Sequence, residues 1–328
     1  MKLSIIVPIY NMEAYIRPCL ESIFRQGLDE CDFEVLLVND GTTDSSMEMV
    51  ADLVAAHANV RVMEQENQGL SAARNTGMDN ALGRFIMFLD SDDLFVDHSL
   101  ASLLNVAIDH DADMTVASFV KMDDEEIGKI GTAATLGGAG GGPEGEVCVT
   151  TGRDVFLHVF NPRECYVWRM IYKRSFLDGH RLRFIPGIYF EDIAFTTECY
   201  LRAGKCVLSP KVIYIYRQRP NSIVYSVNMK KLLDMNVTLE HLYKIKGILC
   251  TTAALRRRMD DTIFSTFSIA IWYLTHDKAL YVEKEKYIGD LRRKLPRMHF
   301  THGLKQRFVS TVFHFIPNVY VWLRARFD

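Results

Sequence analysis

Three carboxylates are crowded into the segment Asp90-Ser91-Asp92-Asp93, which directly follows the apolar run of residues 85–89. Crowded carboxylates repel one another and raise one another's pKa unless a cation relieves them. A hard divalent ion such as Mg2+ or Mn2+ takes one or two carboxylates, keeps several waters and binds substrate phosphate oxygens with its remaining positions. The segment therefore predicts a metal site for a phosphorylated ligand. The alternative is the start of a helix with solvated aspartates, and we expect that role for Asp93.

A second polar segment, Asp40-Gly41-Thr42-Thr43-Asp44, follows the strand expected at residues 34–39 in the same way. A carboxylate at a strand end can accept the imide N–H of a pyrimidine or the hydroxyl of a ribose, while Gly41 lets a ligand approach the backbone. The alternative is a plain turn that caps a helix. The first apolar run ends correspondingly, in Pro8-Ile9-Tyr10-Asn11.

Small residues recur in a third segment, residues 67–77. Gly69, Ala72, Ala73 and Gly77 would share a helix that must lie close to a sheet. Arg74 on the same helix can face a diphosphate, or it can brace acidic loops through salt bridges, and both can hold.

The elements that must position these segments alternate short apolar runs with stretches of helical period, which is typical of parallel strands joined by crossover helices. We expect strands at 3–8, 34–39, 60–64, 84–90 and 113–119, and helices at 14–26, 44–56, 70–82 and 98–110. Asp44 and Asp97 stand at expected helix N-caps. Because ligands bind at the carboxyl ends of the strands in such a sheet, the polar segments are expected at one edge.

Taken in order, the segments Pro8-Ile9-Tyr10-Asn11, 39–44, 69–75 and Asp90-Ser91-Asp92-Asp93 resemble the inverting family 2 glycosyltransferases with the GT-A fold. The resemblance covers roughly residues 1–225. It implies an α/β fold, Rossmann-like, with a mostly parallel sheet flanked by helices. It also implies a nucleotide-diphosphate sugar as donor, with a UDP-sugar favoured, and a Mn2+ or Mg2+ ion.

The resemblance also implies roles for individual residues. Asp40 should read the base, Asp90 the ribose side, and Asp92 should bind the metal. Glu191-Asp192 looks like the family's later acid pair, with Asp192 as the catalytic base. The residues expected to contact the sugar donor are Pro8, Tyr10, Asn11, Asp40, Gly41, Asn67, Gly69, Arg74, Asp90 and Ser91, and those expected on the acceptor side are Trp168 and Arg217.

Inverting sugar transfer needs one base for the acceptor hydroxyl and one cation for the departing nucleoside diphosphate. The alternative for Glu191-Asp192 is an acid pair that merely starts a helix. Another enzyme class is a haloacid-dehalogenase-like phosphatase, because residues 88–92 superficially match its motif, although that nucleophile normally follows the first strand. A catalytically idle GT-A binding protein is the third possibility, and the intact Asp92 and Asp192 count against it.

The expected domains are a catalytic domain over residues 1–225 and a helical extension over 226–328. Within the first we expect a nucleotide-binding half at 1–120, a flexible insertion at 121–147 and an acceptor-side half at 148–225. The insertion contains the glycine-rich stretch 137–143, which neither follows a strand nor opens onto a helix.

Charge divides the chain unevenly: residues 1–130 contain 8 Lys or Arg and 24 Asp or Glu, against 30 and 17 in the remainder. This suggests that the first part meets cations and the second something anionic, unless both are only solvated faces. In the basic tail 291–328, a helical stripe is formed by Leu304, Phe308, Val312 and Phe315. The tail is expected either to bind an anionic membrane or to pack on the catalytic domain or a second copy, as in a homodimer.

The composition, 48% hydrophobic and 24% charged, is that of a globular protein. Seven cysteines without a CxxC spacing indicate neither a disulfide framework nor a zinc site, and favour a reducing cytoplasm. No ordered base-reading motif accompanies the basic tail, so nucleic acid is not an expected partner. We expect a cytoplasmic enzyme, peripheral on the inner membrane face if the tail binds lipid, that extends a surface polysaccharide on a saccharide or lipid-linked acceptor.

Overall fold

The computed structural model describes residues 1–129, 146–219, 227–295 and 303–327. The chain forms two compact units. The first comprises Met1–Val155, Tyr166–Gly187 and Arg202–Pro220, and the second comprises Phe156–Cys165, Ile188–Leu201 and Asn221–Asp328. Compactness therefore groups residues 188–201 with the C-terminal helices, whereas the expected boundary at 225 placed them with the sheet.

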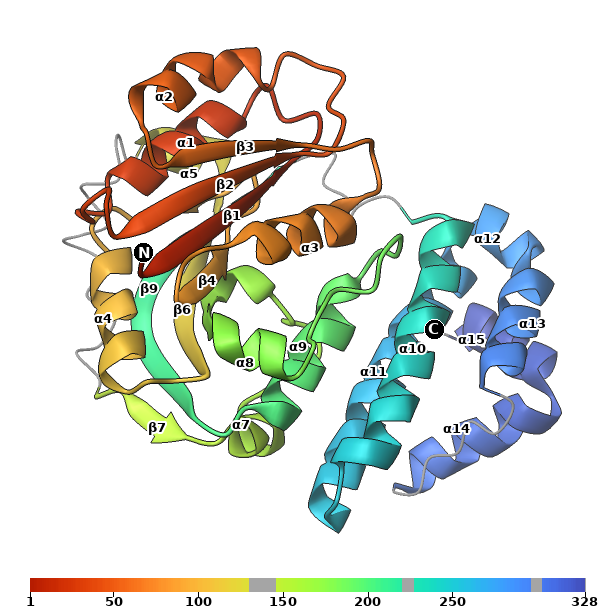
Figure 1. Ribbon diagram of the computed structural model, residues 1–328. Helices are drawn as coiled ribbons and strands as arrows, with labels where there is room; N and C mark the ends of the chain where they lie inside the picture. The colour runs from red at the N-terminus through yellow and green to blue at the C-terminus, as the bar shows by residue number, and fades with distance from the viewer. Residues whose placement is uncertain (130–145, 220–226, 296–302, 328) are drawn as a thin grey trace. The chain divides into compact units, whose positions relative to one another are not determined.

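The first unit is built on one sheet (Figure 1). The strand order is β3-β2-β1-β4-β8-β6-β9-β5, with β7 paired to β9. Its strands are β1 (Leu3–Ile9), β2 (Phe33–Asn39), β3 (Val60–Glu64), β4 (Phe85–Phe88), β5 (Leu94–Phe95), β6 (Met114–Asp123), β7 (Cys148–Thr150), β8 (Met170–Lys173) and β9 (Cys206–Gln218). The five strands expected from the sequence are all present.

The expected parallel pairing is confirmed among the first four strands and again between β6 and β9. β1 pairs in parallel with both β2 and β4, and β2 pairs in parallel with β3. β8 then lies antiparallel between β4 and β6, and β5 and β7 both pair antiparallel to β9. The sheet as a whole is therefore mixed.

Helices cover this sheet closely. They are α1 (Ile16–Phe24), α2 (Ala51–Ala56) after the 3-10 turn η1 (Glu48–Val50), α3 (Leu70–Asn80), α4 (Leu100–Asp109), α5 (Asp124–Lys129), α7 (Gly152–His158) and α8 (Arg174–Gly179). α3 runs along β1 and β2 (Figure 1). A Cβ added at Gly77 would stand 2.3 Å from Cγ2 of Ile6, which confirms that the small residues of this helix permit a close approach to the sheet.

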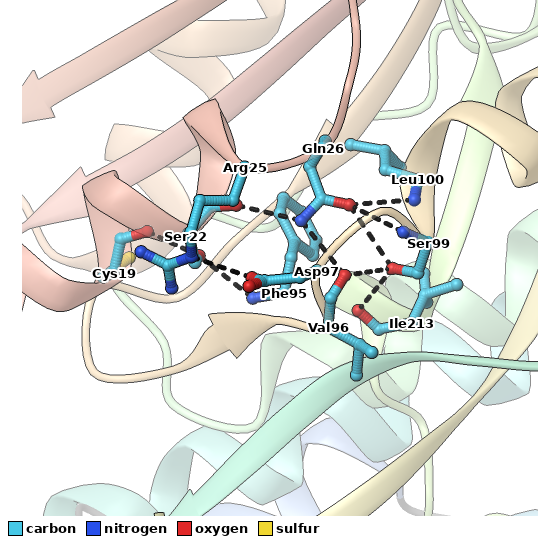
Figure 2. A network of polar contacts seen from close by, with 10 residues as sticks. All are labelled: Cys19, Ser22, Arg25, Gln26, Phe95, Val96, Asp97, Ser99, Leu100 and Ile213. Atoms are coloured by element: carbon cyan, nitrogen blue, oxygen red, sulfur yellow. Dashed lines mark hydrogen bonds and ion pairs between the residues drawn. The ribbon is translucent and has the colours of Figure 1, made fainter. Parts of the chain in front are cut away.

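Both expected helix caps are wrong. Asp97 forms an ion pair with Arg25 at 2.9 Å instead of capping α4. The buried Gln26 side chain takes the capping role, because its Oε1 accepts from the backbone N–H groups of Ser99 and Leu100 at 3.1 and 2.9 Å (Figure 2). Its Nε2 donates to the carbonyl oxygens of Ser22 and Val96, so all of its polar capacity links α1 to the start of α4.

Asp44 is the second residue that does not cap the expected helix. The helix expected from residue 44 begins only at η1, and the Asp44 carboxylate accepts hydrogen bonds from Ser46, Thr42 and the backbone N–H of Glu13. Its pKa is lowered to about 2, because these hydrogen bonds outweigh the opposing effect of burial.

The expected insertion at 121–147 begins later than predicted. Residues 121–123 continue β6, and residues 124–129 form α5. The glycine-rich stretch 137–143 lies outside the described residues.

The second unit is helical. Its helices are α9 (Glu191–Arg202), α10 (Met229–Leu249), α11 (Ala253–His276), α12 (Lys278–Val282), α13 (Lys284–Lys294), α14 (Leu304–Phe315) and α15 (Pro317–Phe327). Side-chain caps fix three of the starts: Asn228 accepts from the N–H of Lys231, Thr252 from that of Leu255, and Asp277 from those of Ala279 and Leu280. Among the described residues, no helix has both the length and the apolar character needed to cross a membrane.

The tail packs on α11 by a different face from the expected stripe. Phe313 of α14 and Tyr320 of α15 are buried against Phe267, with ring centroids 5.1 and 6.2 Å away. Phe308 and Phe315, which belong to the stripe, are 68% and 73% exposed. The interpretation that the stripe itself packs on protein is therefore wrong for these two residues in this chain.

Candidate active site

Three loops meet at one edge of the sheet because their strands are parallel neighbours. In the register, Ile9 at the end of β1 lies beside Asn39 at the end of β2, and Ile6 lies beside Phe88 at the end of β4. The segments that follow these strands therefore leave the sheet on the same side. The structure thus brings together the polar segments at residues 10–11, 40–44 and 90–93.

The loop after β1 is tied to the loop after β2. Asn11 has φ = 55°, in the left-handed region that asparagine tolerates better than most residues. Its Oδ1 accepts from the backbone N–H of Thr43 at 3.0 Å, and its own N–H donates to Oγ1 of Thr42 at 2.8 Å. Asn11 therefore fixes both loops, while the neighbouring Tyr10 is exposed and Pro8 is buried within β1.

Asp40 is buried and joins the end of β2 to the segment before α3. One of its oxygens accepts from Nε2 of Gln65 and the N–H of Gln68, and the other accepts from the N–H of Gly69 at 2.8 Å. A carboxylate oxygen can accept a second hydrogen bond, so the carboxylate keeps capacity for a base. Its base-reading role stays a prediction.

The glycine beside it is required by geometry. Gly41 has φ = +68°, and a Cβ there would lie 2.9 Å from the backbone nitrogen of Asn67. Gly69, at φ = +87°, starts α3. Asn67 is exposed between them. Gly41 thus lets the Asp40 and Asn67 loops lie against each other, while Gly69 provides the left-handed backbone just before α3.

Arg74 braces the aspartate loop. Its side chain is only 1% exposed, its Nη2 donates to Oδ1 of Asp90 at 2.7 Å, and its guanidinium lies over the rings of Phe88 and Phe184. The bracing interpretation of Arg74 is therefore the one its contacts support. Ser91, next in the loop, is also buried.

Asp92 and Asp93 are held from β9. The Asp93 carboxylate accepts from the Tyr214 hydroxyl at 2.7 Å and the Arg217 N–H at 2.8 Å, and burial, followed by the charges of Asp92 and Asp90, raises its pKa well above the usual value. Asp93 is therefore not the solvated acid that the sequence suggested. Burial and the charge of Asp90 also raise the pKa of Asp92, against the opposing pull of Arg219.

Two arginines of the β9 end bind the same aspartate. Arg217 Nε donates to the backbone oxygen of Asp92, and Arg219 Nε donates to its Oδ2, both at 2.7 Å. Their guanidinium carbons lie 5.2 and 5.1 Å from the ring centroid of Tyr15. Arg217 is also paired with Asp124.

An aromatic stack supports the loop from behind. Trp168, 2% exposed, is stacked between Tyr166 and Tyr214, with centroids 4.6 and 4.0 Å away. The Tyr214 hydroxyl in turn accepts from the N–H of Asp90 at 3.2 Å. Trp168 and Arg217 are thus both buried supports of the aspartate loop, and an acceptor contact of either stays a prediction.

The aspartate loop suits a divalent metal that arrives with phosphates. Asp90 and Asp92 each have one oxygen bound to an arginine in the structure, and their side chains are 25% and 19% exposed. Mg2+ and Mn2+ need only one or two carboxylates when a diphosphate supplies further oxygens. The described residues include no group of three or more His, Cys, Asp or Glu placed to hold an ion. Asp90 and Asp92 fit the one or two carboxylates that an ion shared with a diphosphate requires.

The second acid pair lies in the second unit. Glu191 and Asp192 open α9, and the preceding Phe190 has φ = +60°, a conformation that costs a non-glycine residue free energy. Glu191 is buried, while Asp192 is partly exposed. After burial, the charge of Asp192 raises the pKa of the nearby Cys165 thiol. Strained backbone of this kind is typical of functional sites.

Sequence reasoning missed several residues of the site. Tyr214 of β9 binds the Asp93 carboxylate, and Tyr15, just before α1, stacks with Arg217 and Arg219; both tyrosines lie more than 60 residues from the aspartate loop in the chain. Nothing local in the sequence around Tyr214 and Arg219 indicates that they would meet the loop after β4.

Comparison with known proteins gives the family. Residues 4–133 match the sequence model of the family described as glycosyl transferase family 2. The chain is 33% identical over 244 residues to the glycosyltransferase EpsJ of Bacillus subtilis, covering 74% of this chain and 68% of that protein. It is 29% identical over 219 residues to the poly(ribitol-phosphate) beta-glucosyltransferase of Bacillus spizizenii, covering 66% of this chain and 32% of that protein.

Solved structures share the fold. S. aureus TarS residues 1–349, crystallised with UDP-GlcNAc, superposes with a TM-score of 0.70 at 18% identity, over 99% of this chain and 90% of that one. The Pyrobaculum calidifontis mannosyltransferase, in complex with GDP-Man and Mn2+, superposes with a TM-score of 0.54 at 16% identity, over 99% of this chain and 86% of that one. The expected GT-A fold with a helical C-terminal region is confirmed. Together with the identity to EpsJ across more than two thirds of both chains, this shows that the protein is a member of glycosyltransferase family 2.

Proposed function

We propose that this glycosyltransferase is metal-dependent and inverting, and that it moves a sugar from a nucleotide-diphosphate sugar to a saccharide or lipid-linked acceptor. The observation that carries the proposal is the aspartate loop, where Asp90 and Asp92 stand at the carboxyl end of β4 with arginine-bound carboxylates. Family membership removes the phosphatase alternative.

Asp92 would bind Mn2+ or Mg2+, with Asp90 beside it. The ion, when bound, neutralises charge on the departing diphosphate. Arg74 keeps Asp90 in place, and the Trp168 stack with Tyr214 keeps the loop rigid. Such fixed positions matter because the transition state is stabilised by charges that need not reorganise.

Asp192 would take the proton from the acceptor hydroxyl as the sugar is displaced, with Glu191 as the next candidate. A partly exposed carboxylate at the start of α9 can reach an acceptor while the strained Phe190 fixes the turn before it. One base suffices, because a single displacement inverts the anomeric centre without a covalent intermediate.

A UDP-sugar is the favoured donor. Asp40 would accept the imide N–H of uracil, and Gly41, Asn67 and Gly69 surround it with backbone that a nucleotide can approach. TarS was crystallised with UDP-GlcNAc, which supports UDP, whereas the mannosyltransferase holds GDP-Man.

The acceptor would be part of a surface polysaccharide. Support comes from the relative that glucosylates poly(ribitol-phosphate) and from the excess of basic residues after residue 130, which suits an anionic chain. The enzyme would work in the cytoplasm. A bound acceptor carried on lipid would bring it to the inner membrane face.

The tail would assist there by binding an anionic membrane. α14 and α15 leave apolar side chains exposed on their free faces, and residues 303–327 contain basic residues but no Asp or Glu. The exposed set is Phe308, Phe315, Ile316, Val319, Trp322 and Leu323. An apolar face with a basic rim fits the headgroup region of anionic lipid. A homodimer through the same face is the competing arrangement.

The test of the proposed reaction is donor turnover with a panel of UDP-, GDP- and TDP-sugars, measured with Mn2+, with Mg2+ and with EDTA. We expect slow hydrolysis of one UDP-sugar that requires the metal and that rises when a saccharide acceptor is added. A protein that binds UDP but hydrolyses and transfers nothing from any donor would instead be an idle member of the fold.

A further inference from the structure

The ion pair between Arg219 and Asp92 uses the carboxylate that the proposed function assigns to the metal. Nε of Arg219 lies 2.7 Å from Oδ2 of Asp92, and the two side chains are only 12% and 19% exposed. A partly buried pair of this kind is screened far less by salt than a surface pair. In this structure, the charge of the Asp92 carboxylate is therefore already balanced by the Arg219 guanidinium.

Arg219 differs from its neighbour Arg217 in what else it binds. Arg217 is anchored by Asp124 and by the backbone oxygen of Asp92, neither of which a metal would require. The other polar contact of Arg219 among the described residues is the Met12 sulfur, 3.7 Å from Nη2 and a weak acceptor. Of these two arginines, Arg219 is therefore the one that would lose its main partner when a metal binds to Asp92.

A divalent ion on Asp92 and the Arg219 guanidinium would repel each other. The repulsion is relieved if a diphosphate enters at the same time, because its oxygens offer the guanidinium a planar, bidentate partner in exchange for the carboxylate. The Tyr15 ring, 5.1 Å from the guanidinium carbon, can keep the side chain stacked during such a change of partner.

We propose that Arg219 occupies Asp92 until the sugar donor arrives, and that it then exchanges the carboxylate for the diphosphate as the metal binds. Arg219 would thereby weaken metal binding to the empty enzyme and strengthen it in the presence of nucleoside diphosphate. Because linkage is reciprocal, the metal would also raise the affinity for the diphosphate by the same factor. This inference rests on the proposed metal role of Asp92.

The experiment is a Mn2+ titration of the full-length protein, with free Mn2+ followed by electron paramagnetic resonance, without and with saturating UDP. For Arg219→Ala we expect Mn2+ alone to bind about tenfold tighter than to wild type, and the factor by which UDP improves Mn2+ binding to fall by about tenfold or more. For Arg219→Lys, which keeps the charge without the planar guanidinium, both quantities should lie between those of wild type and those of Arg219→Ala. Arg61→Ala is the matched control, because Arg61 pairs with Glu34 on the neighbouring strand β2.

Unchanged or weaker binding of Mn2+ alone to both Arg219 variants, with UDP still improving Mn2+ binding to wild type, would overturn the exchange and leave the proposed function standing. Failure of wild type to bind Mn2+ even with UDP would overturn both. Circular dichroism shows whether each variant is folded, so that loss of binding through unfolding is recognised. If the alanine variant unfolds, the lysine variant still tests the exchange.

Discussion

At the scale of single residues, every carboxylate of the aspartate loop has an assigned partner within the first unit. Arg74 binds Asp90, Arg219 binds Asp92, and Tyr214 binds Asp93. Burying a charge is costly unless it is paired and hydrogen-bonded, so these partners are what allow three acids in four positions. The crowded acids are visible in the sequence, but their partners are not, because these come from α3, from β9 and from the residue just after β9.

Asp192 carries the chemical step in this account, so Asp192→Asn should lower turnover by about 100-fold or more, the scale expected for a positioned general base. Binding of the sugar donor should change little, because the proposed donor contacts lie in the first unit. Steady-state kinetics and a UDP titration measure the two effects separately. Glu240→Gln, an exposed acid on α10, is the control, and near wild-type turnover in Asp192→Asn would shift the base to Glu191.

The lowered pKa of Asp44 predicts how the free energy of unfolding depends on pH in acid. Its pKa is about 2 in the folded protein, below the ordinary 3.8, so its contribution to stability is present above about pH 4 and disappears as the pH falls toward 2. Asp44→Asn should lower the free energy of unfolding at pH 7 by roughly 1 to 2 kcal/mol, allowing for its partial exposure.

Urea unfolding at pH 7, 5 and 3 checks this, with the exposed Glu48→Gln as control. The difference between Asp44→Asn and wild type should shrink at pH 3. A difference that stays constant with pH would mean that the Ser46 and Thr42 hydrogen bonds do not depend on the carboxylate charge.

At the scale of elements, the positions of five strands followed from the apolar runs, while the pairing of the later strands, including the parallel pairing of β6 with β9, did not. β8 is four residues long and lies antiparallel between β4 and β6, and a short apolar run contains no information about its neighbours. The expected cap of α4 was wrong for the same reason: Asp97 has the favoured residue type, but the buried Gln26, just after α1, binds the N–H groups instead.

The small residues of α3 were the most informative local signal, and they support a prediction. Gly77→Ala should lower the free energy of unfolding by about 1 to 3 kcal/mol, because a methyl group would overlap the Ile6 side chain on β1. Gly247→Ala on α10 is the matched control. It has open space at its Cβ, so it should be neutral or stabilising by up to about 1 kcal/mol. Equal stability of both variants would show that α3 can move away from β1 without cost.

At the scale of the whole molecule, the tail packs within the chain by one face and leaves apolar side chains exposed on another. One face of α14 and α15 packs on α11 through Phe313 and Tyr320, and the other leaves Phe315 and Trp322 exposed. The helical period predicted an amphipathic segment correctly, but it could not tell which of two apolar faces would find a partner within the chain.

We expect the intact protein to co-sediment with phosphatidylglycerol vesicles, less so as salt is raised, and not with neutral vesicles. The double variant Phe315→Ser, Trp322→Ser should bind at least tenfold more weakly. Trp272→Ser is the matched control, since Trp272 is equally exposed on α11. Absence of vesicle binding by the intact chain, together with a dimer that the double variant loses in analytical ultracentrifugation, would assign the face to a second copy.

The central claim is that Asp92 binds a metal ion shared with the diphosphate of the sugar donor. Calorimetric titration of UDP into wild type and Asp92→Asn, each with Mn2+ and with EDTA, tests it most directly. We predict that Mn2+ improves UDP affinity by about tenfold or more for wild type and hardly at all for the variant, because the variant lacks the charged ligand. A variant that loses the same affinity with and without Mn2+, while wild type gains nothing from the metal, would contradict the claim.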